Sequence, residues 1–247
     1  MTLFRNMFYL AFAAGLVVGV VMTILQHSFT VPLILAAEAY ENAGAAAEPA
    51  HDHAAPAAGT AVAAHAHDAE AWAPSDGFQR TFFSVAANIV TGVGFSLLLI
   101  AVSEFAGGIV GWRSGLLWGL AGFAVFTLAP DLGLPPELPA MPAADLLARQ
   151  IWWLGTVIAA AVALALIFLG RSPAMAAVGI LLLVLPHLVG APQPESFETP
   201  IPEALHHQFV VAVTLTNLVF WAVLGSSIGV LRPRVAAWLD APNGRLA

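Results

Sequence analysis

The chain has 247 residues, of which 60% are hydrophobic and 9% are charged, and its formal net charge is −7. Soluble domains carry about 25% charged residues, so this composition indicates an integral membrane protein. The absence of cysteine excludes disulfides, thiolate metal sites and thiol catalysis. The sequence contains no P-loop, no zinc-protease motif and no basic nucleic-acid-binding pattern. We therefore expect neither an enzyme nor a nucleic-acid partner.

Six apolar segments are long enough, or nearly so, to cross the hydrocarbon core of a bilayer as helices. In chain order they comprise residues 7–26, 82–103, 109–129, 151–170, 173–190 and 209–231. The fifth is the weakest, because it is short and contains Pro186. The sequence thus predicts an all-α, polytopic transmembrane bundle of about six spans, surrounded by membrane lipid. Its expected parts are a first span with a short outer helix that begins at Pro32 (1–41), a flexible loop (42–76) and a five-span core (77–247).

The basic residues set the expected orientation. All eight are arginine, and with the N-terminus inside, only Arg80 and Arg149 fall on the outer face. Because basic residues are enriched in cytoplasmic segments, this distribution predicts a bacterial inner-membrane protein with cytoplasmic termini and a periplasmic loop at 42–76. The four-residue spacing of Asp145 and Arg149 predicts a local ion pair in an outer connection.

The predicted outer loop carries four histidines. His51 and His53 form one His-x-His pair, His65 and His67 form a second, and each pair has an aspartate beside it. The surrounding Ala, Pro, Gly and acidic residues cannot bury a core, so we expect the loop to be disordered. Imidazole binds late first-row divalent metals, so the pattern predicts metal capture. The alternative is a hydrophilic tether in which the histidines are incidental.

The other four histidines lie at predicted outer ends of spans. They are His27, His187, His206 and His207. Helix packing could bring these imidazoles together as a shared metal site, with Glu38 as an oxygen ligand. The alternatives are ordinary polar residues at a membrane boundary and a solvated helix end.

Few polar side chains lie within the predicted spans. Intramembrane polar residues tend to face the bundle or a path through it. We therefore predict that a transport path is lined by Asn88, Thr91, Asn217 and Glu104.

Several segments resemble the CbtA family of probable cobalt transporter subunits. The resemblance lies in residues 26–41, 88–99, 115–123, 128–156, 185–195 and 216–221. Its most specific part is GLLWGLAGF (115–123), followed by a Pro-rich outer turn that runs into RQIWW (149–153). The resemblance implies a role in cobalt supply for cobalamin synthesis and a partner, a small single-span CbtB-like subunit. It also implies about five spans, where the pattern here gives six.

Two functions follow from this reading. The first is uptake of divalent cobalt, or nickel, from the outer face, with the metal as cargo and no permanently bound cofactor. The second is a non-conducting metal-capture or assembly subunit of a multi-component transporter. The sequence leaves open the choice of metal, the energy coupling and whether the chain forms a homo-oligomer.

Overall fold

The computed structural model describes residues 2–47, 74–75 and 77–240. Every regular element in these ranges is helical, which confirms the predicted all-α class. In chain order the elements are α1 (Thr2–Leu25), η1 (Gln26–Thr30), α2 (Val31–Ala47), α3 (Phe78–Glu104), α4 (Trp112–Phe123), η2 (Ala124–Leu128), α5 (Ala129–Asp131), α6 (Leu146–Phe168), α7 (Pro173–Val189) and α8 (Glu203–Asp240).

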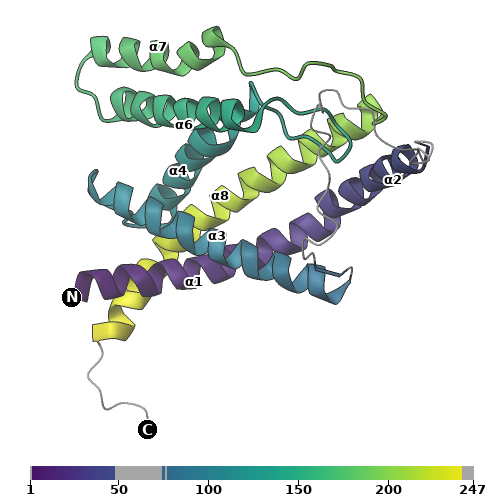
Figure 1. Ribbon diagram of the computed structural model, residues 1–247. Helices are drawn as coiled ribbons and strands as arrows, with labels where there is room; N and C mark the ends of the chain where they lie inside the picture. The colour runs from purple at the N-terminus through teal and green to yellow at the C-terminus, as the bar shows by residue number, and fades with distance from the viewer. Residues whose placement is uncertain (1, 48–73, 76, 241–247) are drawn as a thin grey trace, which may run out of the picture.

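Five helical runs in the described residues are long and apolar enough to cross a membrane. They are Phe4–Ala43, Phe78–Glu104, Trp112–Asp131, Leu146–Phe168 and Glu203–Leu239. The fifth predicted span corresponds to α7, which has 17 residues. At 1.5 Å per residue α7 is about 25 Å long, short of the roughly 30 Å hydrocarbon core. It lies along α6 as the second arm of an antiparallel hairpin (Figure 1).

The helices run between two ends of the molecule. At the first, which we call the terminal end, α1 begins beside the last turns of α8 (Figure 1), and the rings of Tyr9 and Trp238 lie 5.7 Å apart. At the opposite end, which we call the loop end, α2 packs against the start of α8 and two connections. The buried apolar residues at this contact are Ala37, Leu138, Ile201 and Phe209.

Two glycine-mediated contacts bring the long helices together. In the α4–α8 pair, Gly115 and Gly225 face each other so closely that a methyl group on either would overlap the backbone of the other. Gly15 and Gly19 of α1 meet the backbone of α3 in the same way. Small residues at such positions let helices approach closely in lipid, where van der Waals packing drives association. The side chain of Trp221, 1% exposed, fills the core beside these contacts.

Both π-helical segments, η1 and η2, end two residues before a proline. Proline lacks an N–H and its ring crowds the carbonyl four residues earlier, which breaks an ordinary α-helix. A π-turn changes this register by one residue, and at η1 the N–H of Val31 donates to the carbonyl of Gln26. The α1–η1–α2 run consequently continues through Pro32, and the α4–η2–α5 run continues through Pro130. The predicted separate outer helix is thus a continuation of the first span.

Two local predictions need correction. The predicted loop was expected to begin at residue 42, but α2 remains helical to Ala47, in keeping with the high helix propensity of its alanines. Arg149 does not pair with Asp145: its Nη2 lies 2.9 Å from Oε2 of Glu137. Asp145 instead caps α6, because its carboxylate accepts the N–H of Ala148 at 2.8 Å. An aspartate at this position satisfies one of the free backbone N–H groups in the first turn of the helix.

Candidate functional site

The predicted metal-capture residues of the loop fall outside the described part of the chain. These residues are His51, His53, His65 and His67. Their role in metal binding therefore stays a prediction that rests on the chemistry of the His-x-His pairs.

The structure gives each of the other four histidines its own surroundings. His187, at the end of α7, packs edge-on against Trp152, with ring centroids 5.9 Å apart. Nε2 of His206, at the start of α8, lies 3.1 Å from the carbonyl oxygen of Pro136. His207 and His27 are exposed. Within the described ranges, no three His, Asp or Glu side chains lie close enough together to hold a metal ion. The described chain alone thus does not assemble the predicted shared site.

Glu38 forms an ion pair at the loop end. Its Oε1 lies 2.7 Å from Nη2 of Arg80, which ties α2 to the start of α3. Both side chains are about one-third exposed. A cation that binds Glu38 would have to compete with a guanidinium, so the predicted ligand already serves a structural contact.

The predicted path residues in the helices have structural partners or face outward. Nδ2 of Asn88 donates to Oγ1 of Thr23 at 3.1 Å and to Oε1 of Gln26 at 2.7 Å, which joins α3 to the α1–η1 segment. Asn217 donates to the carbonyl of Val213 within α8 at 3.0 Å. Thr91 is exposed on α3. These contacts show what the side chains do in the fold, and the path role of the residues stays a prediction.

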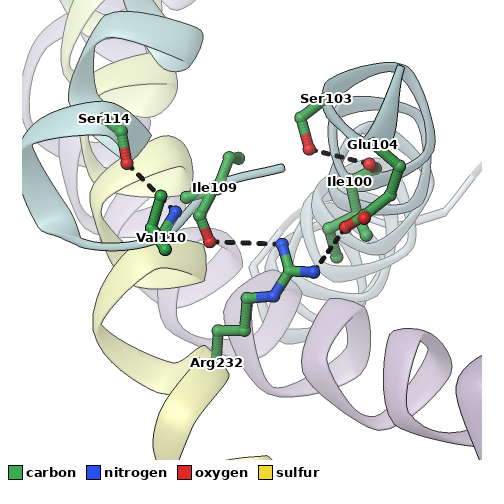
Figure 2. Close-up of polar contacts among 7 residues, drawn as sticks. All are labelled: Ile100, Ser103, Glu104, Ile109, Val110, Ser114 and Arg232. Atoms are coloured by element: carbon green, nitrogen blue, oxygen red, sulfur yellow. Dashed lines mark hydrogen bonds and ion pairs between the residues drawn. The ribbon is translucent and has the colours of Figure 1, made fainter. Parts of the chain in front are cut away.

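Glu104 belongs to a polar contact at the terminal end (Figure 2). Nη2 of Arg232, on α8, lies 2.5 Å from Oε1 of Glu104 at the end of α3, while Nη1 donates to the carbonyl of Ile109 at 3.2 Å. One guanidinium therefore ties α8 to both α3 and the turn before α4. The turn itself uses Gly107 and Gly108, whose φ values of +91° and +76° favour glycine.

Asp131 is a residue that we did not single out from the sequence. It ends α5, and its Oδ2 is buried without a hydrogen-bond partner among the described residues. The sequence signal was available, since Asp131 is the lone acidic residue at the C-terminal end of an otherwise apolar span. Such a position is a functional candidate because unpaired carboxylates are costly in a membrane protein.

Five long apolar helices that run between two polar ends define a multi-pass helical membrane protein. The family model described as "Probable cobalt transporter subunit (CbtA)" matches residues 4–232. The chain therefore belongs to the CbtA family. No curated protein and no solved structure matches it. The match covers every described helix except the first residues of α1 and the last residues of α8, and it supports a role in metal transport.

Proposed function

We propose that this chain admits divalent cobalt, or nickel, across the inner membrane from the periplasm and supplies cobalamin synthesis. The observation that carries this proposal is the separation of imidazole and guanidinium along α8. His206 and His207 lie in its first turns at the loop end, and Arg232 and Arg234 lie near its terminal end. With basic residues on the cytoplasmic side, the imidazoles face the periplasm, where incoming metal would be collected.

The membrane potential can drive such uptake without a nucleotide site. Moving two charges through 100 mV releases about 4.6 kcal/mol, twice the single-charge value. This free energy corresponds to roughly 2000-fold accumulation at equilibrium. In this proposal, a cation that reaches Glu104 at the inner end of the path competes with the guanidinium of Arg232 for the carboxylate.

A second candidate function has its own support. Since no three potential ligands meet in the described residues, a complete metal site would need the loop histidines or another subunit. The chain would then be a non-conducting capture or assembly subunit. The description of the family as a transporter subunit implies such partners, and we propose a CbtB-like single-span protein as the first to test.

Uptake of Co²⁺ by sealed proteoliposomes containing this chain alone tests conduction. We expect a potential-dependent signal from the wild type. Deletion of residues 48–70 should weaken uptake at scarce metal only, because ligands that only collect the ion raise its local concentration without shaping the path. His207→Ala should lower uptake even at saturating metal if His207 shapes the path, whereas the neighbouring exposed Gln208→Ala serves as the matched control. Uptake that appears only when the CbtB-like protein is added would support the second function and reject conduction by the chain alone.

A further inference from the structure

We propose that Asp131 is a cation-binding residue of the outer part of the transport path, an inference that rests on the proposed transport of a divalent metal. Asp131 is the last residue of the third candidate span, Trp112–Asp131. Its Oδ2 is buried and has no hydrogen-bond partner in the described part of the chain. Among the same residues, Glu38, Glu104 and Glu137 each pair with an arginine, and Asp131 pairs with none.

The position of Asp131 on its helix makes the missing partner more significant. The α4–η2–α5 run ends at Asp131, and the carbonyls at a helix C-terminus carry a partial negative charge. A carboxylate is therefore electrostatically unfavourable there, whereas a cation is favourable. Backbone donors already occupy the nearby carbonyl of Pro130, which accepts the N–H groups of Gly133 at 3.0 Å and Leu134 at 2.9 Å. A bound cation would offset the charge of this carboxylate.

The segment that follows Asp131 contacts the imidazole of His206 and the ring of Trp152, which itself packs against His187. Gly133 packs so tightly against the ring of Trp152 that a methyl group would overlap it, and the other contacts of Trp152 include the ring of His187. The carbonyl of Pro136 meets Nε2 of His206 at 3.1 Å. Asp131 is thus followed by a segment that contacts one imidazole directly, that of His206, and reaches a second, that of His187, through the ring of Trp152.

An open groove lies next to this connection. It has a volume of about 580 Å³, and Trp152, Thr156 and Pro186 are among its lining residues from α6 and α7. The lining of this groove is mostly apolar, so the groove borders the connection without offering further ligands to a cation. With one carboxylate and no three-ligand cluster in the described residues, the ion would keep most of its water ligands. Such weak binding suits a relay site, because conduction requires the ion to leave again.

Reconstituted uptake of Co²⁺ tests the role of Asp131. Asp131→Asn keeps the side-chain volume and removes the negative charge, and we expect uptake to fall by about tenfold or more, the scale seen when even the surroundings of a bound metal are altered. Asp131→Glu should retain part of the activity. Asp145→Asn is the matched control, because asparagine caps a helix as well as aspartate does and the exposed Asp145 carboxylate only caps α6. Unchanged uptake by Asp131→Asn would overturn the inference.

A second measurement separates this inference from the proposed function. In the full chain with the four loop histidines replaced by alanine, Co²⁺ should raise the thermal unfolding midpoint, since a ligand that binds only the folded state stabilises it. Asp131→Asn should abolish this shift. An equal shift in both proteins, or no shift in the parent, would overturn the inference. A shift that depends on Asp131 in a chain that shows no uptake would keep the site and reject conduction by the chain alone.

Discussion

The ion pairs in the described residues each join two different parts of the chain. Glu38 and Arg80 connect α2 to α3, and Glu137 and Arg149 connect the segment between α5 and α6 to α6 itself. Partly exposed ion pairs contribute little to stability on average. Arg232 also donates to a backbone carbonyl, that of Ile109. Loss of this side chain removes two contacts that hold three helix ends together.

Arg232→Ala should lower the free energy of unfolding by about 1–3 kcal/mol, because the carbonyl of Ile109 and the Glu104 carboxylate lose their donor. Arg234→Ala is the control: its Nη1 donates only to the carbonyl of Val230 in its own helix, and the side chain is exposed. We expect the control to stay within about 0.5 kcal/mol of wild type. Thermal unfolding in detergent, followed by circular dichroism at the helix band, measures both. Equal midpoints for the two variants would show that the contact in Figure 2 does not hold the terminal end together.

At the level of the elements, the prolines and glycines decide how the helices continue and meet. Pro32 and Pro130 lie within long helical runs because a π-turn precedes each of them. The glycines of α4 and α8 let the two backbones touch. At Gly115 and Gly225 no side chain separates the two helices. The stability of the bundle should therefore depend on the volume at these two positions.

Gly225→Ala should be severely destabilising, since its new methyl group would overlap the carbonyl oxygen of Gly115 and force the two helices apart. Overpacking of this kind typically costs about 1–3 kcal/mol or more. Gly94→Ala is the matched control, because nothing lies within 4 Å of the added methyl group and alanine favours a helix over glycine. The unfolding midpoint should fall for the first variant and stay level or rise for the second. A tolerated Gly225→Ala would mean that α4 and α8 do not approach as the structure has them.

At the level of the whole molecule, the connections alternate between the two ends. The α3–α4 turn lies at the terminal end, and the connection from α7 to α8 lies at the loop end (Figure 1). In this arrangement the short helix α7 also counts as a crossing element, because it carries the chain from the terminal end back to the loop end. A locally thinner bilayer or tilted neighbours can accommodate a short helix.

Accessibility labelling tests this topology directly, because the chain has no native cysteine. Ala106→Cys places a thiol in the exposed α3–α4 turn, and Glu195→Cys places one in the exposed α7–α8 connection. In intact cells a membrane-impermeant maleimide should label only the cysteine at 195, since the arginine distribution predicts that the terminal end is cytoplasmic. Both should react after permeabilisation. Labelling at 106 in intact cells would reverse the orientation, and labelling at both positions would remove α7 from the crossing elements.

The sequence by itself determined the class of protein and the position of its apolar helices. Hydropathy and charge are properties of short segments, so 82–103 and 151–170 could be located without knowledge of their neighbours. The same local reasoning identified the family resemblance that the match to residues 4–232 confirms. It also identified the His-x-His pairs, whose function stays a prediction.

Only the tertiary structure decided which side chains meet. The sequence spacing placed Arg149 with Asp145, and packing placed it with Glu137. Nothing local distinguishes Glu104, which finds Arg232 across the bundle, from Asp131, whose Oδ2 has no partner among the described residues. The physical reason is that a contact between residues far apart in the chain depends on how closely the helices approach, and that distance is set by the packing of many residues at once.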